Sequence, residues 1–272
     1  MNSVYTESTY PFLAMLSTQK LRTLIIRRAA KASAVFDMFP DEGSVVIGLS
    51  GGADSLVLVD ILFEMSRRWR KNILFMPVMI DAGFFTIQEE KLQKVHDFCH
   101  KRGMDLEIIK CHNIAEIIQS GRSRFPPCFT CSRIRRKTLL ECADKTGVRT
   151  IVLGHHKDDL IETFLLNMLF SRRISAIMPK QKLFNGLFSL IRPLILVDEK
   201  YIKRYSSLRA FPVIEKTCPY TGATEREWVK KLIAKMESEK SGIKKNILRS
   251  IFYPRVDYLW GEFSHLADKL LK

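Results

Sequence analysis

The segment from Ser50 to Ser55, Ser-Gly-Gly-Ala-Asp-Ser, has the composition of a phosphate-binding loop. It lies between an apolar strand-like run at 45–49 and an apolar helical run at 56–62. Two adjacent glycines let backbone N–H groups approach an anion, and the helix that follows directs the positive end of its dipole to the same place. The lysine-containing Walker sequence is absent, so this is not the common nucleotide P-loop. The carboxylate of Asp54 at such a place predicts either a bound metal ion or a simple helix cap.

Three cysteines form a second group, Cys128 and Cys131 in a C-x-x-C and Cys218 before a proline. Structural zinc sites close with four ligands, and the chain has no second pair of cysteines or histidines at a suitable spacing. Three thiolates on a [4Fe-4S] cluster leave one iron open to a sulfur or substrate atom. Zinc and a redox pair remain alternatives. We expect the other three cysteines, at 99, 111 and 142, to be small core residues.

A third motif, Gly154-His155-His156-Lys157-Asp158-Asp159, follows a strand pattern and opens an amphipathic helix. Two acids at a helix start complement the helix dipole, which is the simplest interpretation. Two carboxylates that face a phosphate loop would repel the phosphates without a cation between them. We therefore expect Mg²⁺ at this motif.

The elements around these motifs alternate between strand and helix patterns, which predicts an α/β fold with a doubly wound parallel sheet. Ligands of such sheets bind at the carboxyl ends of strands, where Asp81 and the first and third motifs fall. We expect a basic helical region at 1–40, a nucleotide-binding domain at 41–195 and a helical region at 196–272 with the third cysteine. Strands are expected at 44–49, 73–80, 106–109 and 150–153, and helices at 13–36, 54–70, 87–102, 132–145 and 158–170.

The charge of the chain is strongly positive, with 44 Lys and Arg residues against 29 Asp and Glu residues and a net charge of +15. The stretches 8–36 and 120–137 contain basic residues and no acid. Such a field attracts phosphate backbones, so we expect a nucleic-acid partner, with a solvated helix face or an anionic membrane surface as alternatives.

No apolar run reaches the ~18 residues that cross a bilayer, and no secretory leader pattern is present. We expect a cytoplasmic protein with reduced cysteines and no membrane partner.

Together, the three motifs resemble the TtcA/TtuA family of ATP-dependent tRNA 2-thiolation enzymes, which are PP-loop ATP pyrophosphatases. The resemblance covers about 20–240, and the cysteine triplet separates it from lysidine synthetase, which shares the H-H-x-D-D element. Ala53 stands where TtcA commonly has Lys, and the zinc fingers of the TtuA branch are absent. The matching segments are 38–55, 128–136, 154–159, 167–168, 191–194, 211–212 and 218–220.

The resemblance implies an adenine nucleotide alpha-hydrolase-like fold and a homodimer that acts on tRNA. ATP would adenylate the C2 carbonyl of a pyrimidine, most simply a cytidine, and sulfur from a cysteine desulfurase or from sulfide would replace the oxygen. The implied phosphate ligands are Ser50, Gly51, Gly52 and Ser55, with Gly154 and Asp81 also in the cofactor site and Asp81 near the adenosine. Mg²⁺ would be held by Asp54 with Asp158 or Asp159, and these three acids are the implied catalytic residues. The implied [4Fe-4S] ligands are Cys128, Cys131 and Cys218, and the implied tRNA-binding residues are Arg133, Arg135 and Arg136.

Two other functions remain open. The first is an ATP pyrophosphatase without a cluster, such as a lysidine-forming or amidating enzyme. The second is a basic RNA-binding module whose nucleotide loop has lost its activity.

Overall fold

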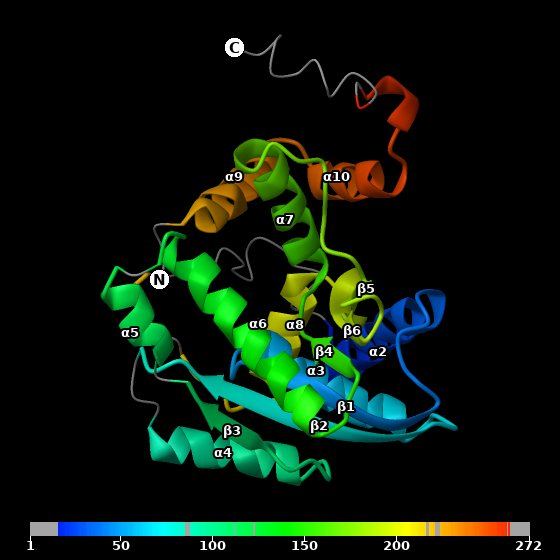
Figure 1. Cartoon of the computed structure of the whole chain (residues 1–272). Coiled ribbons are helices and arrows are strands. Elements are labelled where there is room, and N and C mark those ends of the chain that lie inside the picture. The colour runs from blue at the N-terminus through cyan, green and yellow to red at the C-terminus, as the bar shows by residue number, and fades with distance from the viewer. Residues whose placement is uncertain are drawn as a thin grey trace.

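The computed structural model describes residues 16–84, 88–111, 113–121, 123–215, 218–220, 224–259 and 261. Its centre is a six-stranded sheet with the order β3-β2-β1-β4-β6-β5 (Figure 1). All neighbouring strands pair in parallel except β5, which is antiparallel to β6 at one edge. The predicted α/β class is confirmed. The strands are β1 (Glu42–Leu49), β2 (Asn72–Asp81), β3 (Glu107–Lys110), β4 (Thr150–Leu153), β5 (Lys180–Leu183) and β6 (Phe188–Ile191).

The central strand β1 is buried on both faces. Val45, Ile47 and Leu49 lie in one hydrophobic core and Val46 lies in a second core, because successive side chains of a strand point to opposite faces. Each fully buried aliphatic side chain of this kind contributes roughly 1.5–3 kcal/mol. This two-sided burial explains why the strand reads as a continuous apolar run.

Helices cover both faces of the sheet (Figure 1). Helices α2, α3, α4 and α8 supply buried side chains to the first core, and α5 and α6 supply them to the second. Helix α7 packs against α9 in a third, smaller core. The helices are α2 (Thr18–Val35), α3 (Ala53–Ser66), α4 (Glu89–His100), α5 (Asn113–Gln119), α6 (Pro127–Lys145), α7 (Lys157–Phe170), α8 (Glu199–Leu208), α9 (Glu225–Glu239) and α10 (Ile243–Phe252), with 3₁₀ turns at Pro193–Leu196 and Val256–Tyr258.

Helix α6 begins five residues earlier than predicted, so the C-x-x-C lies in helix and not in a loop. Pro126 is extended and Pro127 occupies the first helical position, where the missing N–H is harmless and the fixed φ favours a helix. The hairpin β5–β6 and the short α5 were not predicted, because four to seven residues carry little periodicity. The Asn185-Gly186 pair between β5 and β6 was the available signal of a turn.

Other expectations fall partly outside the described residues, namely the start of the helix at 13–36 and the start of the helix at 87–102. The division into segments 1–40, 41–195 and 196–272 remains a prediction, although α2 and α8 share one core with the sheet. Within the described part of the chain, no helix has the length and apolar character to span a membrane.

A buried polar group on α3 joins it to α8 and to the turn that follows α4. Asp60 on α3 is 2 % exposed, and it accepts hydrogen bonds from Arg102 Nε (2.9 Å) and from the Tyr205 hydroxyl (2.7 Å). The Arg102 guanidinium also lies 3.6 Å from the centre of the Phe98 ring. The carboxylate is therefore paired and hydrogen-bonded, as a buried charge must be.

We expect the substitution Tyr205→Phe to lower the free energy of unfolding by about 1–3 kcal/mol, because it removes a donor from the buried Asp60. Urea denaturation with an unchanged m-value measures this. The control is Tyr258→Phe, at a ring that is 73 % exposed, for which we expect a change below about 0.5 kcal/mol. Equal stabilities of the two variants would contradict the assignment.

Candidate functional site

A cavity of about 280 Å³ lies where β1 and β4 end. From β1 the chain continues to one side of the sheet through β2 and β3, and β4 lies on the other side. The cavity therefore occupies the switch point of the topology, where open α/β sheets bind ligands. Its walls include Ser50, Asp54 and Ser55 after β1, Gly154, His155 and Asp159 after β4, and Ser132, Arg135 and Arg136 on α6.

The loop after β1 is held in shape by hydrogen bonds to a serine hydroxyl group of its own. The Ser55 hydroxyl accepts from the Ser50 N–H (3.1 Å) and donates to the Gly52 carbonyl (2.9 Å). Gly51 has φ +75°, and a Cβ there would lie 2.9 Å from Ile214 Cδ1, so only glycine fits. The described residues provide no side-chain cap for α3, which leaves its first N–H groups without a side-chain acceptor at the edge of the cavity. An anion fits this position.

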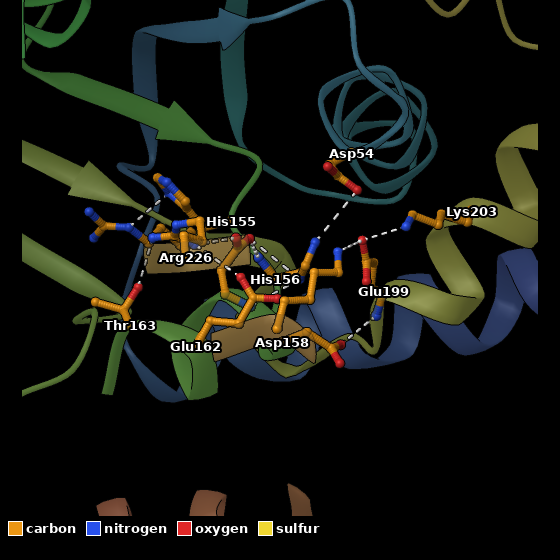
Figure 2. A network of polar contacts seen from close by, with 12 residues as sticks. Asp54, His155, His156, Asp158, Glu162, Thr163, Glu199, Lys203 and Arg226 are labelled. Carbon is orange, nitrogen blue, oxygen red and sulfur yellow. Dashed lines mark hydrogen bonds and ion pairs between the residues drawn. The ribbon is translucent and has the colours of Figure 1, made fainter. Parts of the chain in front are cut away.

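The loop after β4 packs directly on the start of α3. A Cβ on Gly154 would lie 3.3 Å from the backbone carbonyl of Asp54. His156 then caps α7: its Nδ1 accepts from the Asp159 N–H (3.3 Å), and the Asp159 Oδ2 accepts from the His156 N–H (3.0 Å). The other ring nitrogen of His156 lies 3.7 Å from Asp54 Oδ1 (Figure 2). The two carboxylates thus flank one imidazole.

Asp54 has the features of a cation ligand. Its side chain is 42 % exposed, yet its Oδ1 is buried and accepts no hydrogen bond from the described residues. Burial raises the pKa of this carboxyl, so the ionised form needs a positive partner. Burial alone would lower the pKa of His156, but the carboxylates of Asp159 and Asp54 outweigh it and raise that pKa. An oxygen without a donor, beside an anion cradle, fits Mg²⁺.

The two acids of the third motif have different surroundings. Asp159 lines the cavity, whereas Asp158 is turned onto Lys244 Nζ (2.7 Å) and the Glu199 N–H (2.7 Å). Asp158 therefore joins α7 to α10 and to the start of α8. Of the alternatives that the sequence left open, this geometry favours Asp159 as the partner of Asp54.

Arg226 on α9 is a site residue that the sequence motifs did not indicate. Its Nη1 lies 3.3 Å from Asp159 Oδ1 and 3.1 Å from Glu162 Oε2, and its Nη2 donates to Thr163 Oγ1 (3.2 Å) (Figure 2). Burial raises the pKa of Glu162 to about 7. No local sequence pattern indicates this contact, because α7 and α9 are distant in the sequence and meet only in the folded chain.

His155 is held by a buried arginine. Arg192 is 3 % exposed, and its Nε donates to His155 Nδ1 (3.2 Å) while Nη1 donates to the Met178 carbonyl (2.6 Å). Burial lowers the pKa of His155 to about 4 and that of Arg192 to about 10. A neutral ring that accepts at Nδ1 carries its proton on Nε2. His155 is therefore an uncharged donor in the cavity wall.

Two of the three cysteines of the second group lie in the first turns of α6. Cys128 and Cys131 are three residues apart on one helix, which places them on the same side. Burial raises the pKa of the Cys128 thiol, and the Cys218 thiol raises it further, so the third cysteine lies within electrostatic range of the first. The residue after Cys131, Ser132, already lines the cavity.

This arrangement suits a cluster better than a single ion. Among the residues that can be described, no three His, Cys, Asp or Glu side chains gather closely enough to hold one metal ion. A four-iron cluster binds each thiolate through a different iron, so its cysteines stand further apart than the ligands of one ion. Two thiols on the helix that lines the cavity, with a third thiol near the first of them, fit such a cluster.

The remaining predicted residues are more scattered. Arg135 and Arg136 line the cavity, whereas Arg133 lies over the Phe125 ring outside it. Asp81 accepts from the Gly83 N–H (3.0 Å), the contact of a turn-forming residue. Cys99 and Cys142 are buried as expected, and burial raises the pKa of each thiol to about 11. Cys111 packs against the second core but is only partly buried, which differs from the predicted core position.

We expect the His155 ring to stay neutral, with its proton on Nε2, from pH 8 down to about pH 5. The folded-state pKa lies below the ordinary 6.5, so the unfolded chain takes up more protons between these values and His155 lowers stability as the pH falls through them. Nitrogen-15 NMR of the histidine rings measures both tautomer and titration, with His155→Gln to assign the signal. A midpoint near 6.5, or a proton on Nδ1, would contradict this.

Comparison with known proteins identifies the family. Residues 23–237 match the model of the PP-loop domain. The tRNA-cytidine(32) 2-sulfurtransferase of Citrifermentans bemidjiense is 31 % identical over 91 % of this chain and 94 % of that protein. The protein with the same name from Pseudomonas fluorescens strain SBW25 is 33 % identical over 87 % of this chain and 85 % of its own length.

Solved structures show the same fold. The U34-tRNA thiolase NcsA from Methanococcus maripaludis, solved with its [4Fe-4S] cluster, has a TM-score of 0.71 at 21 % identity and covers 89 % of this chain and 80 % of its own. An NMN synthetase from Francisella tularensis has a TM-score of 0.51 at 12 % identity, over 87 % and 93 % of the chains. The family predicted from the sequence is confirmed. The chain belongs to the PP-loop family and, within it, to the TtcA/TtuA family of ATP-dependent tRNA 2-thiolation enzymes.

Proposed function

We propose that this protein uses ATP to replace the C2 oxygen of a cytidine in tRNA with sulfur. The observation that carries the proposal is that a phosphate loop and a helix with two cysteines line or border one cavity. The names of the curated relatives support cytidine 32 as the nucleotide. The proposal includes a cytoplasmic homodimer that receives its sulfur from a cysteine desulfurase or from sulfide.

The cavity supplies the groups that adenylation needs. ATP phosphates bind to the N–H groups and hydroxyls of the loop from Ser50 to Ser55. Asp54 with Asp159 would hold Mg²⁺, which would neutralise phosphate charge. Arg135 and Arg136 approach from the opposite wall. The C2 carbonyl oxygen attacks the α-phosphorus, and pyrophosphate leaves. Placement and charge neutralisation are the contributions of the protein to this step.

Adenylation turns the C2 oxygen into part of a good leaving group. A hydrosulfide equivalent then adds to C2, the C2–O bond breaks, and AMP departs with that oxygen. A [4Fe-4S] cluster on Cys128, Cys131 and Cys218 would supply an iron without a protein ligand, where sulfur binds. The neutral His155 donates its Nε2–H within the cavity without a change of charge, which suits a phosphate oxygen.

The substitution Asp54→Asn should lower pyrophosphate release from ATP, in the presence of tRNA, by about 10²-fold or more, because it removes the charge that holds the cation. The control is Asp144→Asn, a surface residue that pairs with Arg149. Equal pyrophosphate release by the wild type and the Asp54 variant would contradict this role and favour the alternative function of an RNA-binding module.

The substitution Cys218→Ser should remove the bound iron and abolish thiolation, because it takes away one of three thiolates. Iron and sulfide analysis after anaerobic purification, with mass spectrometry of the tRNA nucleosides, measures both. Cys142→Ser is the control, since a hydroxyl there can keep the contact that the thiol makes with Glu107. Persistence of iron and thiocytidine would exclude Cys218 as a ligand. Pyrophosphate release by an iron-free wild type would favour the lysidine-forming or amidating alternative.

A further inference from the structure

Two exposed aromatic rings stand at the start of α6, on either side of Cys128 in the sequence. Phe125 and Phe129 are each 51 % exposed. Their ring centroids are 5.0 Å apart and their planes are inclined by 42°. The rings therefore form one apolar surface and not two isolated side chains. Single exposed apolar residues are ordinary, but a joined pair beside candidate reactive groups indicates a binding surface.

The segment that carries these rings is tied down by short-range hydrogen bonds. The Ser123 hydroxyl accepts from the Phe125 N–H (3.1 Å) and lies against the Thr130 hydroxyl. The Thr130 N–H donates to the Pro126 carbonyl (3.0 Å), and the two prolines at 126 and 127 restrict the backbone further. A surface that is already ordered loses little conformational entropy when a ligand binds.

The charge around the rings is positive. The Arg133 guanidinium carbon lies 6.0 Å from the centre of the Phe125 ring. Arg124, which precedes Phe125 in the sequence, is exposed. Arg135 and Arg136 continue the positive surface into the cavity wall. An occupant of this surface must offer a flat apolar face together with negative charge. Unpaired nucleotides of RNA have both, and aromatic rings beside arginines are the usual way to hold them.

We propose that Phe125 and Phe129 form a stacking platform for an unpaired base next to the nucleotide that enters the cavity. This rests on the proposed function, because the RNA is then the tRNA substrate. The two rings are exposed and are not part of the cavity lining, whereas Ser132, one turn beyond Cys128, lines the cavity. A base stacked on the rings therefore holds the RNA loop while its neighbour passes inward.

The test is the double substitution Phe125→Leu with Phe129→Leu, which keeps apolar side chains and removes the π faces. The probe is an unmodified tRNA transcript with cytidine at position 32, and its Kd is measured at several salt concentrations. We expect Kd to rise about tenfold or more, as for the loss of one stacked base. The slope of log Kd against log salt should stay unchanged, because no phosphate contact is lost.

Two variants serve as controls. Phe252→Leu makes the same exchange at a ring that is 50 % exposed on α10, which lies apart from the start of α6 (Figure 1), and it should leave Kd unchanged. Arg133→Gln should weaken binding and also reduce the salt slope, as expected for a phosphate contact. The difference between these salt responses separates stacking from charge.

Several outcomes would overturn the platform. The first is an unchanged Kd in the double variant. The second is an equal loss of affinity when the RNA is a fully paired duplex. The third is a change in the sedimenting mass of the protein on double substitution, which would show that a second copy of the chain covers the rings. A wild-type chain that binds the transcript but neither releases pyrophosphate nor thiolates it would overturn the proposed function instead, while the affinities still decide the platform.

Discussion

The site depends on one close approach of two backbones. The absence of a side chain at Gly154 lets the loop after β4 pack against the start of α3, where a Cβ would lie 3.3 Å from the Asp54 carbonyl. This approach brings Asp54 and Asp159 to opposite sides of His156. Like charges in a partly buried place repel, so the pair is stable only with positive charge nearby. The fold therefore creates a demand for cations at the position where a phosphate loop supplies an anion cradle.

The C-terminal helices meet part of that demand from outside. Three basic side chains of α9 and α10 pair with acidic residues on α7 and at the start of α8. The pairs are Arg226 with Glu162, Lys230 with Glu199, and Lys244 with Asp158. The three carboxylates are buried although their basic partners are not, so the loss of a basic partner leaves a buried charge unpaired and costs several kcal/mol. Their effect is to fix the rotation of α7. Because Asp159 is on that helix, its direction toward the cavity is set by residues far away in the sequence.

Local sequence was sufficient for the elements and the motifs, but not for the contacts between them. The strand at 150–153 and the loop at Ser50 were predicted because their signals lie within a few residues. The choice between Asp158 and Asp159 required the rotational phase of α7, since neighbouring helix residues differ by about 100° in direction. Ile214, whose N–H donates to the Gly51 carbonyl (2.9 Å), carries no signal at all. Its contact exists only after the chain has folded.

Because α6 begins before the C-x-x-C, Cys128 and Cys131 lie on the same rigid helix as residues that line the cavity. Ser132, Arg135 and Leu139 line the cavity and recur at the spacing of one helical face. Cys128 continues the same face by one turn, a rise of about 6 Å along the axis. On a loop, the thiols and the arginines would move independently of one another. On one helix Cys128 and Cys131 keep a fixed separation from Arg135 and Arg136, so any shift of α6 moves these thiols and arginines together.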